Sequence, residues 1–298
     1  MNDNFLIMFI FLELSMIIFI CIMHRGKYSC YCSIKYFLVQ TISSILFISS
    51  FLLFYLNSYI LLFSMLIKIG VWPFHIWFIN ICLVISWINL FYILSFQKFF
   101  PIYIIFCFYS FNSLSFIFLI IIMLNCLVGF LNCFYIIDIR GFFGYTGIVD
   151  QSWLICGFIF SDFTGYLYIF IYIIFRFLIF FNFDKYRVKY LSFINFNFSS
   201  NCIFILNFIS LIRIPPSFGF FLKFIFIYIF IYNGLYFFSF LFIFIKIIRI
   251  FFFSRCIILL VNNYSTDFTR NSFSEFLSYI FFNFLLNIFG VFILFFLI

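Results

Sequence analysis

The sequence predicts an all-α polytopic membrane protein, because of its composition, its long apolar runs and the polar residues between them. Of its 298 residues, 68% are hydrophobic, 29% are aromatic and 8% are charged, and the mean hydropathy is +1.32. A soluble globular domain has about 25% charged residues. A bilayer core about 30 Å thick needs about 20 apolar residues for each spanning helix. We therefore expect one transmembrane domain over residues 1–298 and no soluble domain.

Polar residues divide the chain into about ten expected helices. The basic group His24-Arg25-Gly26-Lys27 closes the first of them. Basic loops mark the side on which a membrane protein is synthesised, so we expect the N-terminus on the opposite side from residues 24–35. The expected spans cover about residues 4–23, 34–56, 59–79, 81–110, 114–137, 144–160, 164–183, 202–231 and 233–253, and a last span ends at Ile298.

Three features of the composition indicate the origin of the gene and exclude some functions of the protein. Phenylalanine occurs 62 times and alanine never, which indicates an A+T-rich gene and hence an organelle genome. The formal net charge of +8 comes from loops without a continuous water-facing surface, so it does not indicate nucleic-acid binding. The ten cysteines are scattered through apolar runs, where they are expected to act as small hydrophobic residues.

Ionisable residues deep inside apolar spans are not explained by loops, and we single out five of them. They are Glu13, Lys68, Lys98, Arg176 and Lys223. A charged side chain at the bilayer centre costs about 2.5–3.5 kcal/mol on insertion scales. Such residues are retained when they pair with a partner or line a polar path, so these five are candidate functional residues.

Each basic candidate also has a structural interpretation. A lysine near a helix end can extend its ammonium group to the headgroups, and this alternative is strongest for Lys98, because Gln97 and Pro101 could mark the end of a span. Arg176 could bond freed backbone carbonyls. His75 could be a buried core histidine or part of a proton path.

Two of the lysines lie beside expected helix breaks. Pro73 follows Lys68, and proline clashes with the carbonyl four residues back, which is that of Ile69. Pro215-Pro216 precede Lys223 and are expected to free the carbonyls four residues before them, those of Leu211 and Ile212. Unsatisfied backbone at membrane depth is tolerated only where it is buried or lines a cavity. Paired broken helices are typical of transporters built from inverted repeats.

These groups could move protons without a cofactor. Burial disfavours the ammonium form of a lysine, and a nearby carboxylate restores it. If that carboxylate moves or is neutralised, the lysine releases its proton. We therefore expect Glu13 and Lys68 to form a switchable pair, with Lys98 and Lys223 extending the relay through the membrane.

Six blocks of sequence resemble the NADH dehydrogenase subunit 2 family, the antiporter-like membrane subunits of respiratory complex I. The run from Met65 to Trp77 is similar to that family's Lys-Leu-Gly-x-x-Pro-Phe-His-x-Trp signature. The other similar blocks are Leu12-Glu13-Leu-Ser-Met, Ile34-Lys35-Tyr-Phe-Leu-Val-Gln40, Gln97-Lys98-Phe-Phe-Pro101-Ile, the segment from Arg140 to Trp153, and Pro215 to Lys223. The last 75 residues or so match only in hydropathy.

The resemblance implies that Glu13, Lys68, Lys98 and Lys223 hold proton-translocating positions, with His75 as a possible relay. It also implies that the first helices of longer family members are absent or supplied by another chain. The family pattern is not followed everywhere. The departures are Ile79 for a proline, Asn80 for a glutamate, Asp150 for a histidine and Ile212-Arg213 for two glycines.

The resemblance further implies a subunit of mitochondrial NADH:ubiquinone oxidoreductase in the inner membrane, with redox chemistry performed by other subunits. The implied partners are antiporter-like subunit 4, small membrane subunits and lipids such as cardiolipin. No cofactor is expected, since the cysteine spacing offers no cluster motif and no Gly-rich nucleotide fingerprint is present.

Other functions remain open at this point. A free-standing cation/proton antiporter would share the helix pattern, and so would another antiporter-like subunit. An ATP synthase a subunit would use Arg176 and leave Lys68 and Lys223 unexplained. A haem-binding cytochrome b is excluded, because His24 and His75 are too few to supply its axial ligands. A purely structural membrane scaffold would need none of the lysines.

Overall fold

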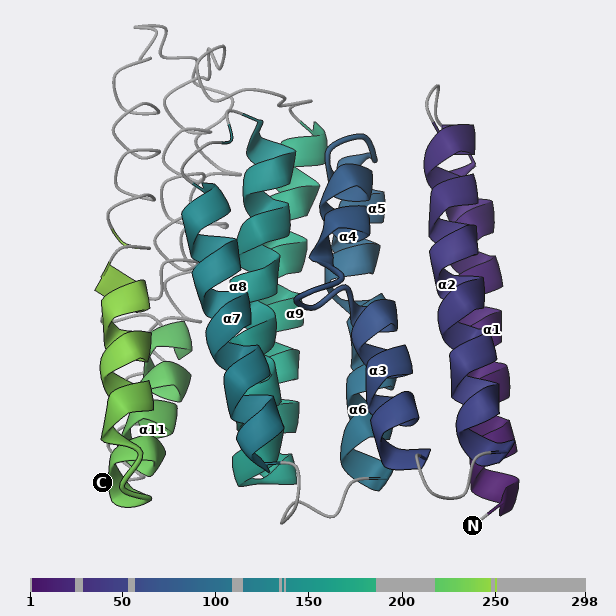
Figure 1. Cartoon of the computed structure of the whole chain (residues 1–298). Coiled ribbons are helices and arrows are strands. Elements are labelled where there is room, and N and C mark those ends of the chain that lie inside the picture. Colours follow the sequence, from purple (N-terminus) through teal and green to yellow (C-terminus); the bar gives the residue numbers. More distant parts are fainter. Residues whose placement is uncertain are drawn as a thin grey trace, which may run out of the picture. The chain divides into compact units, whose positions relative to one another are not determined.

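The described part of the chain is helical, with no strand among its residues. The computed structural model describes residues 2–24, 29–52, 57–108, 115–133, 136, 138–185, 218–247 and 250. Its helices are α1 Asn2–Met23, α2 Ser29–Leu52, α3 Asn57–Ile69, α4 His75–Cys82, α5 Trp87–Leu94, α6 Phe96–Phe108, α7 Ser115–Cys133, α8 Ile139–Phe160, α9 Asp162–Lys185 and α11 Phe218–Tyr232 (Figure 1). A further apolar helix covers Tyr236–Ile247.

The structure confirms the expected helical architecture with segments able to span a membrane. It does not test the expected number of about ten spans. Four described segments are long and apolar enough to cross a bilayer: Leu6–Met23, Cys30–Ser50, Trp87–Cys107 and Asp162–Lys185. The last expected span and the double proline Pro215-Pro216 lie outside the described residues. The number of spans and the inverted repeats therefore stay predictions.

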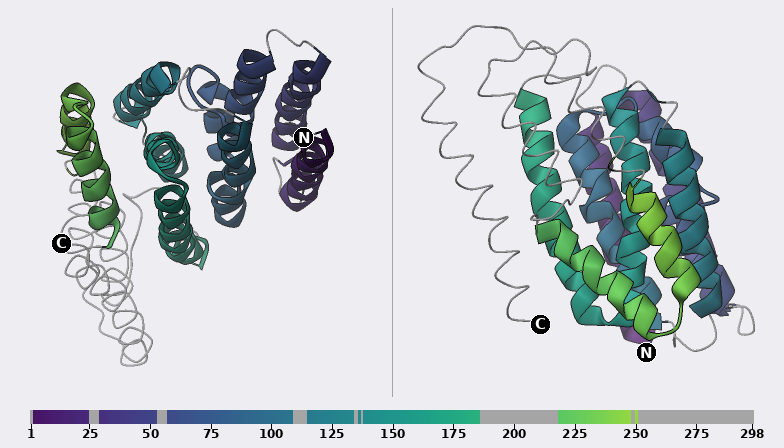
Figure 2. Two further views of the ribbon diagram at one scale, coloured as in Figure 1. Left: turned by 90° about the horizontal axis from the view of Figure 1, so that it is seen from below. Right: turned by 90° about the vertical axis from the view of Figure 1, so that its left-hand side faces the viewer.

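The molecule divides into two compact units. The first holds α1 to α8 and α9 as far as Gly165, and the second holds the rest of α9 and α11. The axes of the helices in the first unit are roughly aligned, as Figures 1 and 2 show. Whether the two units form the single domain expected over residues 1–298 stays a prediction.

Within the first unit, α2 packs on α1 and α3, and α6 packs on α3. Two short helices, α3 and α4, replace the one interrupted span expected over residues 59–79, with an irregular segment between them (Figure 1). The helices α5 and α6 also follow each other closely and form the candidate span Trp87–Cys107. Pro101 lies inside α6 and does not end it.

Outward-facing side chains on α1 and α2 are mostly large and apolar, as expected for helices in contact with lipid or with other membrane helices. Leu14 and Ile18 on α1 and Ile34 and Ile45 on α2 are each about half exposed or more. Inward-facing positions include Met16, Phe19 and Phe47, which are buried. Several polar residues of α2 are also buried, among them Ser33, Gln40, Ser43 and Ser50.

Candidate functional site

The end of α3 is fixed by glycine, and this end positions Lys68. The Val71 N–H donates to the Leu66 carbonyl at 3.2 Å, and the Gly70 N–H donates to the Ile67 carbonyl at 3.2 Å. These two bonds form a Schellman motif, which needs a left-handed residue after the helix. Gly70 supplies it with φ of 73°. Lys68 therefore lies in the last turn of α3, where the helix dipole favours a positive charge.

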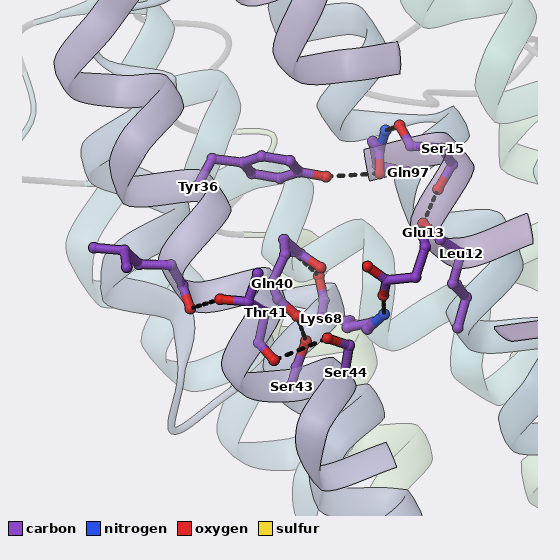
Figure 3. A network of polar contacts seen from close by, with 11 residues as sticks. Leu12, Glu13, Ser15, Tyr36, Gln40, Thr41, Ser43, Ser44, Lys68 and Gln97 are labelled. Carbon is purple, nitrogen blue, oxygen red and sulfur yellow. Dashed lines mark hydrogen bonds and ion pairs between the residues drawn. The ribbon is translucent and has the colours of Figure 1, made fainter. Parts of the chain in front are cut away.

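Glu13 on α1 and Lys68 on α3 form an ion pair inside the first unit. The Lys68 Nζ lies 3.3 Å from the Glu13 Oε1, and the Lys68 side chain is only 3% exposed while that of Glu13 is 23% exposed. Figure 3 shows the two side chains pointing toward each other. An amine and a carboxylate at this distance can exchange a proton directly or hold it as a charged pair.

The backbone freed by the helix break is satisfied by side chains from other helices. The Gln151 Nε2 of α8 donates to the Ile69 carbonyl at 3.3 Å, which is the carbonyl that Pro73 was expected to free. The Gln40 Nε2 of α2 donates to the Lys68 carbonyl at 3.3 Å. The Trp72 N–H donates to the Asn125 Oδ1 at 2.7 Å. The break is therefore lined by polar protein groups, as backbone at membrane depth requires.

A second set of hydrogen bonds ties α1, α2 and α6 together near the ion pair. The Tyr36 hydroxyl of α2 donates to the Gln97 Oε1 at 2.8 Å. The Gln97 Nε2 donates to the Ser15 carbonyl of α1 at 3.0 Å. Figure 3 shows this set beside the Glu13–Lys68 pair. Because Ser15 lies two residues after Glu13, these bonds hold the carboxylate-bearing turn of α1 in register.

Lys98 is buried in the interior of the first unit and is 4% exposed. The alternative that Gln97 and Pro101 mark a span boundary is corrected, because α5 and α6 make one candidate span around Lys98. The Lys98 Nζ lies 3.9 Å from the centroid of the Phe78 ring of α4. An ammonium over a ring face is stabilised by the ring quadrupole, which helps a cation to exist at this depth.

The second unit holds the other two basic candidates. Lys223 on α11 and Arg176 on α9 are both buried. The Arg176 guanidinium lies 5.1 Å from the centroid of the Tyr172 ring and 5.6 Å from that of Phe180. These rings are one turn before and one turn after it on α9. Arg213 lies outside the described residues.

His75 begins α4, directly after the break, and is half-buried. Its place at the break is consistent with a relay, which stays a prediction. Among the described residues no three His, Cys, Asp or Glu side chains come close enough to hold a metal ion.

One buried acid is not among the candidate residues predicted from the sequence. Asp150 lies in the middle of α8 and is 1% exposed. The sequence signal was available, since an aspartate between Val149 and Gln151 interrupts an expected span. The burial identifies it as an intramembrane ionisable group, like the five candidates.

Comparison with known proteins agrees with the resemblance drawn from the sequence. No protein-family model matches the chain. The chain is 28% identical over 263 residues to NADH-ubiquinone oxidoreductase chain 2 of Anopheles gambiae, covering 76% of each chain. It is 26% identical over 252 residues to the protein of the same name from Locusta migratoria, covering 78% of this chain and 73% of that one.

Solved structures share the fold at low sequence identity. A chain of respiratory complex I from Thermus thermophilus matches 96% of this chain and 73% of its own length, with a TM-score of 0.79 and 14% identity. A chain of the Mrp complex from Dietzia sp. DQ12-45-1b matches 83% of this chain with a TM-score of 0.76 and 15% identity. The present chain spans 55% of that Mrp chain.

Proposed function

We propose that this chain, a relative of the NADH-ubiquinone oxidoreductase chain 2 proteins, is a proton-translocating membrane subunit of respiratory complex I. It belongs to an oxidoreductase assembly, and its own role is to carry protons while other subunits perform the oxidation of NADH. The residues that carry the protons are Glu13, Lys68, Lys98 and Lys223, with His75 as an additional relay group.

The observation that carries the proposal is the buried Glu13–Lys68 pair beside a broken helix. While Glu13 is ionised, it holds Lys68 as an ammonium group. When Glu13 is displaced or protonated, the ammonium loses its partner in a medium that disfavours charge. An N–H bond of Lys68 then breaks and the proton passes to the next acceptor, while the amine stays neutral until a new proton arrives.

The setting of this activity is part of the same proposal. The chain is a multi-pass protein of the mitochondrial inner membrane, encoded by an organelle gene, and its partners are the other membrane subunits of the complex with lipids such as cardiolipin. The organelle origin is supported by the 62 phenylalanines and the absence of alanine. The sequence relatives support the assembly, because their name is that of a subunit of NADH-ubiquinone oxidoreductase.

A free-standing antiporter is the second function with some support, from the fold of the Mrp chain. That likeness at 15% identity concerns the fold alone, while the sequence relatives are chain 2 proteins. Purification separates the two functions. A complex I subunit copurifies with NADH dehydrogenase activity, whereas a free-standing antiporter purifies alone and exchanges cations in vesicles.

The test of the proposed function is Lys68→Met in the assembled complex. Ser64→Ala is the matched control, because Ser64 is also buried on α3, one turn before Lys68, and has no titratable proton. We expect K68M to lower NADH-driven proton uptake by inner-membrane vesicles by about tenfold or more, since a positioned proton-transfer group contributes about 10²–10⁴-fold to its step. A structural scaffold predicts unchanged uptake in both variants, and that result rejects the proposal.

A further inference from the structure

Gln97 joins three helices beside the Glu13–Lys68 pair. It lies in the first turn of α6. Its Oε1 accepts from the Tyr36 hydroxyl of α2 at 2.8 Å, and its Nε2 donates to the Ser15 carbonyl of α1 at 3.0 Å. Because a backbone carbonyl can only accept, it fixes which end of the amide carries the nitrogen. Both ends of the Gln97 amide are therefore used, and we call this set of two hydrogen bonds the amide bridge.

The amide bridge acts on the turn of α1 that bears Glu13. Ser15 follows Glu13 by two residues, which is less than one turn of about 3.6 residues. Among the described residues, two polar contacts join the middle of α1 to other helices: the ion pair with Lys68 and the hydrogen bond from Gln97. Figure 3 shows the two contacts close together. When the ion pair opens, the amide bridge is the polar contact that still holds this turn.

The amide bridge does not depend on the charge of the relay groups. The amide, the hydroxyl and the backbone carbonyl that form it are neutral, whereas the contact between Glu13 and Lys68 changes when a proton moves. A charge-assisted hydrogen bond is about twice as strong as a neutral one, so the pair loses much of its attraction when its charges are lost. Apolar packing is not directional. The neutral bridge therefore sets the position of the α1 turn at that step.

Tyr36 gives the amide bridge a firm anchor on α2. It is 1% exposed, and its ring centroid lies 5.1 Å from that of Phe19 on α1 and 6.1 Å from that of Trp77 on α4. One turn later on α2, Gln40 donates to the Lys68 carbonyl at 3.3 Å. The helix α2 therefore links the turns that bear both partners of the ion pair, one directly and the other through the amide bridge.

We propose that Gln97 is a positioning residue, which holds the α1 turn so that the Glu13 carboxylate returns to the Lys68 amine each time their charges are restored. Gln97 carries no proton itself, because its amide has no titratable group near neutral pH. It acts through the position of the Glu13 turn. This inference rests on the proposed function and adds to it the residue that sets the geometry of the pair.

The experiment measures proton uptake per NADH oxidised in vesicles that contain the assembled complex. Gln97→Met keeps the length of the side chain and removes both hydrogen bonds of the amide bridge. Ser95→Ala is the matched control, because Ser95 is buried two residues earlier and its hydroxyl donates to the Phe91 carbonyl at 2.6 Å, outside the bridge. We expect Q97M to lower uptake by about tenfold or more, since a misplacement of about 1 Å can cost about 10²-fold, while S95A keeps wild-type uptake.

Combination with Glu13→Gln separates positioning from a general structural role. The readout is the midpoint of thermal inactivation of the complex. Without the carboxylate, Gln97 has no group to position, so E13Q/Q97M should lower the midpoint by less than the sum of the two single changes. E13Q/S95A should be additive, because Ser95 shares no partner with Glu13.

Each outcome decides the proposal. Wild-type uptake by Q97M overturns it, and so does an additive E13Q/Q97M variant, because the amide bridge is then only structural. An equal loss in S95A also overturns it. If Q97M does not assemble, Tyr36→Phe replaces it in both measurements, because it keeps the ring and removes one hydrogen bond of the bridge. We then expect a loss of about threefold, since one hydrogen bond contributes less than two, and wild-type uptake by Y36F overturns the proposal.

Running Lys68→Met alongside separates this inference from the proposed function. Normal uptake by K68M rejects the proposed function itself. A loss in K68M together with normal uptake by Q97M rejects only the positioning role of Gln97.

Discussion

Lys68 and Arg176 are both buried cations, and the two units of the molecule accommodate them differently. In the first unit the Lys68 amine lies 3.3 Å from the Glu13 carboxylate, beside a broken helix. In the second unit the Arg176 guanidinium lies between the Tyr172 and Phe180 rings on the continuous helix α9. Burial disfavours both charges, and the amine of Lys68 lies next to a carboxylate that can take its proton.

The difference separates a carrier from a fixed charge. A lysine amine can lose its proton when its surroundings change, whereas arginine stays protonated in proteins. A carboxylate partner makes the charge of Lys68 depend on the state of Glu13. Aromatic rings stabilise the Arg176 cation permanently. We infer that Lys68 exchanges protons and that Arg176 supplies a constant positive charge to the second unit.

The largest effect that would test this contrast is expected for Glu13→Gln. The amide cannot balance the ammonium, and removing one partner of a buried ion pair costs about 3–5 kcal/mol. We expect E13Q to lower the thermal stability of the complex in detergent and to abolish most NADH-driven proton uptake. The double variant E13Q/K68M should be less destabilised than the sum of the two single changes. Additive effects would show that the two groups do not interact.

A smaller effect is expected for Gln151→Leu, which tests the backbone break that distinguishes the Lys68 region from α9. The Ile69 carbonyl loses its donor, and a buried polar group left unsatisfied costs about 1–3 kcal/mol. The midpoint of thermal inactivation should fall, with the amount of assembled complex largely kept. An unchanged midpoint in Q151L would mean that the break is satisfied in another way.

The smallest effect is expected for Arg176→Lys. The positive charge is kept and the planar stacking on Tyr172 and Phe180 is lost, at about 0.5–2 kcal/mol for a cation–π contact. Proton uptake per NADH oxidised should stay within about twofold of wild type, since the charge that we regard as constant is still present. Abolished uptake in an assembled R176K complex would place Arg176 in the relay and remove the contrast with Lys68.

The break near Lys68 could be predicted from sequence because its causes are local. Pro73 would clash with the Ile69 carbonyl if the helix continued, and Gly70 ends the helix three residues before the proline. The groups that satisfy the break could not be predicted, because Gln151 is 82 residues away from Ile69 along the chain. Pairing of that kind depends on how helices pack and leaves no local pattern.

The site was predictable where a charge interrupts an apolar run. Glu13 and Lys68 were expected to pair on the cost of burial alone, and the structure brings them together. The interpretation of Pro101 as a possible span end was wrong, because proline is tolerated inside membrane helices where neighbours satisfy the freed groups. Asp150 also interrupts an apolar run, but its burial at 1% exposed depends on helix packing and is visible only in the structure.

The most direct test of the central claim is NADH-driven proton uptake by an assembled Lys68→Arg complex. Arginine keeps the positive charge next to Glu13 and can form the same ion pair, but it does not release its proton. If the Glu13–Lys68 pair functions by proton exchange at Lys68, the K68R complex assembles in normal amounts. Its NADH-driven proton uptake is then about as low as that of the K68M complex. Wild-type uptake by K68R would contradict the account, because a permanent charge would then be sufficient.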